Sequence, residues 1–288
     1  MLADCLSLNI GGCASNAAID LARVGVRVGV VGCVGDDPFG RFVIETLRQA
    51  GVDTQSIRSL ADVGTSGTLI VNVQGEDRRF IHTIGANGRI AVSDIPLDRV
   101  RQARVLYVGG YLLMPALEAR PLAELFRQAR AAGVTTLLDV VVPGAGEYWP
   151  LLEPLLPETD VFLPNNDEGE ILTGLTDPHG QAERFRSAGA RTVVITCGGR
   201  GTVLAGEALR LEAGSYPVEY VGATGAGDAF DAGYIAGLLE GGGPRRCLEW
   251  GSALGASCVR SIGATESVFD REQAEAFMRQ HRLAIKEW

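Results

Sequence analysis

The chain has 288 residues, of which 46% are hydrophobic and 21% charged, so we expect one large packed α/β domain with a small appendage. Its net charge of -9 and its lack of a basic patch argue against nucleic acid as a partner. No apolar run is long enough to span a membrane, and residues 1–10 lack the regions of a signal peptide. The six scattered cysteines have no metal-ligand spacing, so the sequence predicts a cytoplasmic protein with reduced thiols.

Strand and helix patterns alternate along most of the chain. The predicted strands are apolar, β-branched runs, and several predicted helices end at a glycine. The predicted helices are residues 15–24, 39–50, 116–132, 182–188 and 229–239, and the predicted strands are residues 26–34, 105–108, 134–140, 161–163 and 192–196. This alternation favours an α/β fold with a mainly parallel central sheet and helices on both faces.

One segment departs from that alternation. Two predicted strands, 67–73 and 79–83, are joined by a turn at 74–77 with no helix between them, and residues 7–10 are a candidate further strand. A small antiparallel sheet of this kind would form a lid over a site, and its apolar residues would need cover from substrate, core or a second subunit. We therefore predict a homodimer, with lid elements at 1–13 and 64–87 and an α/β core at 14–63 and 88–288.

The most informative motif is Gly225-Ala226-Gly227-Asp228, at the start of the apolar helix 229–239. Small residues at a helix start leave backbone N–H groups free to hold an anion at the positive end of the helix dipole. Asp228 is placed to take a proton from an attacking alcohol. The alternative is an aspartate that only stabilises the first helical turn.

A second motif directly follows the predicted strand 161–163. Ligands of parallel sheets bind beyond the carboxyl ends of the strands, where Asn165 and Glu168 are expected. Asn165 can bond a phosphate or its water, and Glu168 can hold magnesium through water. The alternative, an ordinary acidic helix start, is equally compatible with these residues alone.

A glycine-rich segment follows the predicted strand 192–196. Thr196, Gly198 and Gly201 would let the backbone approach a nucleotide closely. The alternative is a hairpin turn into a strand at 202–204.

The fourth motif lies near the amino terminus. Gly11 and Gly12 allow a ligand to approach closely, and Asn16 offers a donor and an acceptor to a polyol. A glycine turn with a locally packed asparagine is the alternative.

Together these four motifs resemble the ribokinase-like (PfkB) carbohydrate kinases, in the family's order and over almost the whole chain. The resemblance implies a Rossmann-like three-layer sandwich with a β-sheet lid, and phosphorylation of a sugar hydroxyl by ATP with Mg²⁺. It implies that Gly225, Ala226 and Gly227 form an anion hole beside the base Asp228, that Asn165 and Glu168 place magnesium and ATP, and that Gly11, Gly12 and Asn16 hold the sugar.

Two departures from the family pattern matter. The family's first strand, which carries a sugar-binding aspartate, would lie upstream of Met1, so we expect a sheet without that element, reduced stability and a sugar pocket open on one side. Many relatives also have an aspartate where this chain has Gly222. Gly263 and Ser267 match later parts of the family's monovalent-cation site, so potassium dependence is doubtful rather than excluded.

Other functions compete with a sugar kinase. A sugar or nucleotide sensor without catalysis and a nucleoside kinase would use the same fold. A nicotinamide oxidoreductase would need a Gly-x-Gly-x-x-Gly motif, and residues 28–40 offer only a distorted version. The sugar itself is not named by the sequence, although Cys13, in place of a basic residue in the double-glycine loop, favours an unphosphorylated substrate.

Overall fold

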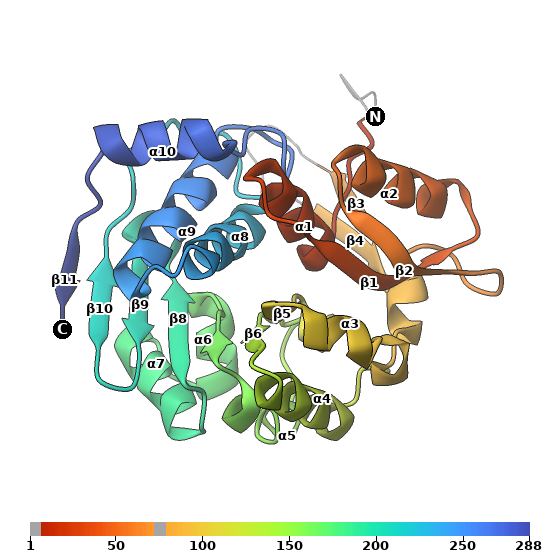
Figure 1. Ribbon diagram of the computed structural model, residues 1–288, viewed down its shortest axis with the longest axis horizontal. Helices are drawn as coiled ribbons and strands as arrows, with labels where there is room; N and C mark the ends of the chain where they lie inside the picture. The colour runs from red at the N-terminus through yellow and green to blue at the C-terminus, as the bar shows by residue number, and fades with distance from the viewer. Residues whose placement is uncertain (1–6, 72–78) are drawn as a thin grey trace.

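The computed structural model describes residues 7–71 and 79–288, and its centre is a seven-stranded sheet (Figure 1). The strand order is β11-β10-β9-β8-β7-β6-β5. These strands are β5 (Val105–Val108), β6 (Thr135–Leu138), β7 (Val161–Phe162), β8 (Thr192–Thr196), β9 (Thr202–Ala205), β10 (Arg210–Ala213) and β11 (Ile285–Glu287). Neighbours from β5 to β8 are parallel, whereas β8 to β11 pair antiparallel. The predicted parallel sheet is thus continued by an antiparallel edge.

Helices cover both faces of this sheet. The larger core cluster includes Leu137 of β6 and Val194 of β8, whereas the next residues, Leu138 and Ile195, belong to a second cluster. Because successive side chains of a strand point to opposite faces, these clusters are the two sides of the sheet. The first side carries α1 (Cys13–Arg23), α8 (Ala226–Leu239), α9 (Pro244–Cys258) and α10 (Arg271–Gln280), and the second carries α4 (Ala119–Ala131), α5 (Trp149–Leu152), α6 (Asn166–Thr173) and α7 (Pro178–Ser187). The predicted three-layer arrangement is confirmed.

A second, smaller sheet lies beside the first. It consists of β1 (Gly29–Gly35) and β2 (Asp53–Leu60), which run parallel and are connected by α2 (Pro38–Gln49). Within the described residues β1 pairs only with β2, and β5 pairs only with β6. Within the described residues the two sheets are therefore separate.

The predicted hairpin is present. Strands β3 (Gly67–Val71) and β4 (Arg79–Thr83) pair antiparallel, and Leu69 and Ile81 are 54% and 68% exposed. The predicted turn at 74–77 lies outside the described residues. The expected strand at 7–10 is wrong, because these residues have no ladder partner and Ile10 instead packs with Ile19 of α1 in a small apolar cluster.

The remaining elements are short connections. They are α3 (Leu97–Gln102) and the 3₁₀ helices η1 (Gly85–Arg89), η2 (Val92–Asp94), η3 (Tyr111–Leu113), η4 (Leu156–Glu158) and η5 (Gly198–Arg200). In the part of the chain described, we find no helix both long and apolar enough to cross a membrane.

Candidate active site

The start of α8 has the shape that an anion site needs. Gly225 has φ 80°, and a Cβ there would lie 2.5 Å from the Ala264 carbonyl oxygen, so only glycine fits. No side chain caps the first turn. The Ala226 amide donates to the Ala223 carbonyl (3.2 Å), whereas the Gly227 amide has no partner among the described residues and open space around its α-carbon. Of the predicted anion hole, Gly227 is therefore the residue best placed to donate.

Asp228 is held by a side chain from the other end of the chain. The Asn16 amide nitrogen donates to Asp228 Oδ2 at 2.7 Å, and Asn16 is only 4% exposed. Burial raises the pKa of Asp228, while hydrogen bonds from Asn16 and Cys13 oppose that rise. A carboxylate with a raised pKa is a stronger base than an ordinary one, which suits proton abstraction.

Three further acids surround Asp228. Asp139, which directly follows β6, accepts a hydrogen bond from the Gly110 amide (3.0 Å). Single ligand atoms of Cys13, Asp139 and Asp228 all lie within 4.8 Å of one another. Burial raises the pKa of Asp139, and Asp231, Glu168 and Asp228 raise it further. The site therefore concentrates negative charge, which favours a bound cation or shared protons.

Asp231 and Tyr107 are functional candidates that the sequence analysis missed. Asp231 is 3% exposed, and the Tyr107 hydroxyl donates to its Oδ2 at 2.8 Å. Burial raises the pKa of Asp231, as does the charge of Asp228. The sequence did contain a signal for Asp231. This residue lies three positions after Asp228 in an otherwise apolar helix, so the two side chains must lie on the same helix face.

Asn165 and Glu168 form a reciprocal cap at the start of α6. Asn165 Oδ1 accepts from the Glu168 amide, and Glu168 Oε2 accepts from the Asn165 amide, both at 2.9 Å. Burial raises the pKa of Glu168 to about 7, although the backbone amides oppose the shift. The predicted acidic helix start is thus real. Carboxylate oxygens facing an acid cluster are also the hard donors that Mg²⁺ prefers, so Glu168 fits a magnesium ion.

The expected nucleotide residues gather at the same edge. Asn165 and Thr196 form a parallel β-bridge at the carboxyl ends of β7 and β8. Gly198 and Gly201 have φ 56° and 97°, and a Cβ on Gly201 would lie 2.0 Å from the Ala213 carbonyl oxygen. The loop is the β8–β9 hairpin connection, so the turn weighed as an alternative is present too. Its place at the carboxyl edge is where ligands of such sheets bind.

The double glycine lies at the start of α1. Gly11 and Gly12 are exposed with open space around them, and Gly12 has φ 94°. Asn16, one turn later, donates its amide nitrogen to Asp228, whereas its buried amide oxygen has no partner among the described residues. The double-glycine motif therefore lies beside the proposed base, and sugar binding by Asn16 stays a prediction.

Residues expected at the monovalent-cation site already have hydrogen-bond partners within the protein. The Ser267 hydroxyl donates to the Ser257 carbonyl (2.7 Å), and the Ser267 carbonyl accepts from the Arg260 guanidinium (2.7 Å). The hydroxyl of Ser261 donates to the Gly263 carbonyl (3.2 Å), and Gly222 brings no carboxylate. The Arg260 guanidinium is thus hydrogen-bonded to one of the residues expected at the monovalent-cation site.

Known proteins resemble the chain along nearly its whole length. Residues 1–271 match the profile described as pfkB family carbohydrate kinase. The chain is 29% identical to a 2-dehydro-3-deoxygluconokinase of Bacillus subtilis, over 96% of this chain and 88% of that protein. It is 28% identical to a ribokinase of Haemophilus influenzae, over 93% and 87%. A ribokinase of Arabidopsis thaliana complexed with ribose and ATP shares the fold, with TM-score 0.81, 24% identity and coverage of 93% and 87%.

Proposed function

Because the chain belongs to the pfkB family of carbohydrate kinases, we propose that it transfers the γ-phosphoryl group of ATP to a hydroxyl of a sugar, with Asp228 as the base. The observation that supports this most is the contact between Asn16 and Asp228. It orients the carboxylate through one of its oxygens beside an uncapped helix start, where the carboxylate can receive a proton.

In the proposed reaction the site residues have separate roles. Asp228 accepts the proton of the attacking hydroxyl, and its raised pKa brings that carboxyl closer to neutral pH, where bases work best. The free Gly227 amide and the α8 dipole stabilise charge that develops on the transferred group. Glu168 would hold Mg²⁺, which would supply positive charge to offset that of the ATP phosphates. Asn16 acts as a positioning residue.

The charge of the site favours an unphosphorylated sugar. The charge of Asp228 raises the pKa values of the neighbouring acids Asp139, Asp231 and Glu168, so a second anion at the sugar end would be repelled. Cys13 in the double-glycine loop offers no positive charge to a phosphate, because a thiol is neutral when protonated and negative when it is not. We extend the proposal to a cytoplasmic homodimer without a potassium requirement, since Arg260 already occupies a carbonyl of that loop.

A coupled assay of ATP consumption with ribose, fructose and 2-dehydro-3-deoxygluconate tests the proposal. Asp228→Asn should lower kcat roughly 10²- to 10⁴-fold and leave the affinity for ATP nearly unchanged. Asp98→Asn is the matched control, since Asp98 also lies in a first helical turn but its side chain is 92% exposed. Wild-type turnover in Asp228→Asn would show that Asp228 is not the base. If none of the sugars stimulated ATP consumption, the proposed kinase activity would be refuted.

A further inference from the structure

A second cleft lies at the opposite end of the sheet from the candidate active site. It has a volume of about 670 Å³, within the range of roughly 300–1,000 Å³ typical of small-molecule pockets. Its walls include Thr135, Asp160 and Thr192, which lie at the amino ends of β6, β7 and β8. The active-site candidates Asp139, Asn165 and Thr196 follow or end the same three strands, so the two sites are separate.

The distance between them can be judged along α8. Asp228 lies in its first turn, whereas Tyr234 and Leu238 line the cleft six and ten residues later. At a rise of about 1.5 Å per residue these positions are roughly 9 and 15 Å further along the helix. A molecule in the cleft therefore leaves the ATP and sugar positions free.

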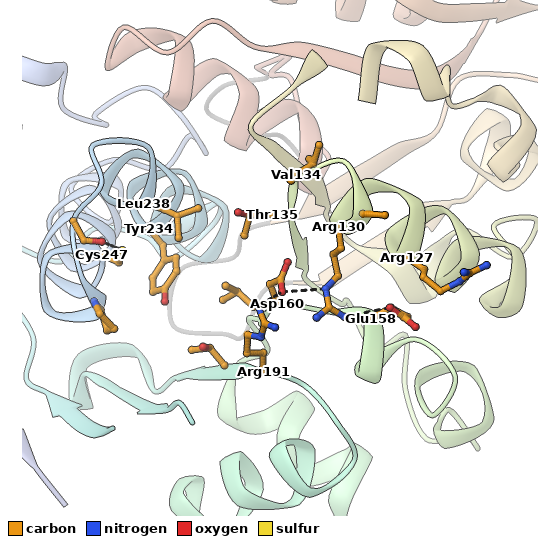
Figure 2. Close-up of a pocket in the computed structure, with 16 residues that line it drawn as sticks. Arg127, Arg130, Val134, Thr135, Glu158, Asp160, Arg191, Tyr234, Leu238 and Cys247 are labelled. Atoms are coloured by element: carbon orange, nitrogen blue, oxygen red, sulfur yellow. Dashed lines mark hydrogen bonds and ion pairs between the residues drawn. The ribbon is translucent and has the colours of Figure 1, made fainter. Parts of the chain in front are cut away.

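The cleft is rich in guanidinium groups although the chain is acidic overall. Arg127, Arg130 and Arg191 face it, together with the carboxylates of Glu158 and Asp160 (Figure 2). Arg130 is tied to the protein through two of its nitrogens, because Nη1 contacts the Pro157 carbonyl and Glu158, and Nε contacts Asp160. Arg191 makes one contact, from Nη1 to Asp160 Oδ1 at 3.3 Å, and its side chain is 62% exposed. Arg191 thus keeps donors for an anion.

A tyrosine hydroxyl also faces the same cleft. Tyr234 is 3% exposed as a whole residue, and in Figure 2 its ring extends from α8, across the cleft from Arg130. Its hydroxyl forms no hydrogen bond with any residue that the structure describes. Burial raises the pKa of Tyr234, so the hydroxyl stays neutral and can donate. The hydroxyl is therefore available to a ligand hydroxyl in the cleft. The Thr135 hydroxyl likewise has no partner among the described residues.

We propose that this cleft binds a small phosphorylated polyol, such as a sugar phosphate. Arg191 would hold the phosphate, since a guanidinium donates two parallel hydrogen bonds to phosphate oxygens. Tyr234 and Thr135 would bond ligand hydroxyls, and Leu238 and Val161 provide apolar walls. This inference goes beyond the proposed function, because it does not depend on catalysis.

Calorimetric titration tests the site with ribose 5-phosphate, fructose 6-phosphate and glucose 6-phosphate, in the full chain saturated with a non-hydrolysable ATP analogue. At least one of them should bind. Arg191→Gln should weaken that binding about 10-fold, and Tyr234→Phe about 3-fold or more, because each removes one hydrogen bond to the ligand. The controls are Arg101→Gln, an exposed arginine outside the cleft, and Tyr216→Phe, a buried tyrosine outside it, which should change binding less than 2-fold.

Melting curves confirm that each variant is folded. Absence of binding at millimolar concentrations, or binding unchanged in both Arg191→Gln and Tyr234→Phe, would overturn the proposal. So would inorganic phosphate binding as tightly as the sugar phosphates, because the cleft would then hold an adventitious ion only. The result is independent of turnover, so failure of the kinase assay would leave it standing.

Discussion

Asp20 is a buried acid whose removal should stabilise the protein. It lies on α1 with 0% exposure, and neither carboxylate oxygen has a hydrogen-bond partner among the described residues. Burial raises the pKa of Asp20 from 3.8 to about 8, although Arg23 opposes the shift. The folded chain therefore binds a proton that the unfolded chain releases, so stability falls as pH rises from about 4 to about 8. At pH 7 this costs about 4 kcal/mol.

Asp20→Asn keeps the shape of the side chain and removes the ionisation. We expect it to raise the free energy of unfolding by about 2 kcal/mol at pH 5 and about 4 kcal/mol at pH 7, following roughly 1.4 kcal/mol per pH unit. Urea unfolding of both proteins at several pH values measures this difference, with the exposed Asp98→Asn as control. An Asn variant that is less stable at pH 7, or a difference that does not grow between pH 5 and 7, would refute the reasoning.

Three other substitutions test separate parts of the structure. Glu168→Gln should raise the Mg²⁺ concentration for half-maximal activity about 10-fold. The wild type should bind Mg²⁺ more weakly as pH falls through about 7, where Glu168 takes up a proton, and the variant should lose that pH dependence. Identical Mg²⁺ titrations of the two proteins would contradict the role of Glu168. Gly225→Ala should destabilise the fold by about 1–3 kcal/mol in urea unfolding. The effect should be clearly larger than that of Gly241→Ala. The two glycines have similar φ values, 80° and 77°, but only at Gly225 would the added Cβ collide with a carbonyl oxygen. If a second copy covers the hairpin, Ile81→Lys should give a monomer in light scattering while Leu151→Lys on α5 does not; a monomeric wild type would exclude the dimer.

The sequence predicted best those elements whose pattern is local and strong. The strands 105–108 and 192–196 have the predicted bounds, because buried apolar, β-branched runs have few other stable arrangements. The strand at 53–60 was missed because its sequence is mostly polar. Within the described residues this strand pairs only with β1. The segment 7–10 was wrongly read as a strand, because a short alternating pattern says nothing about whether a partner strand exists.

Motifs at helix starts could likewise be found from residue spacing, whereas contacts between distant segments could not. The cap joining Asn165 to Glu168 is local and follows from a spacing of three residues. The pair Tyr107 and Asp231 is separated by 124 positions, and no local pattern connects the two. The same is true of Asn16, whose amide nitrogen donates to Asp228, 212 positions away. Local caps were thus predictable from residue spacing, and the hydrogen bonds between distant segments were not.

The contact between Asn16 and Asp228 also affects how the protein is made. The two residues are 212 positions apart, so a ribosome adding about 5–20 residues per second completes the second roughly 10 to 40 s after the first. Ala17 and Leu21 of α1 belong to the same core cluster as Phe230 of α8. During translation the apolar face of α1 therefore stays exposed until α8 has been synthesised. Exposed apolar surface of this kind is what chaperones bind. The contact with Asp228 cannot form before nearly four-fifths of the polypeptide has been synthesised.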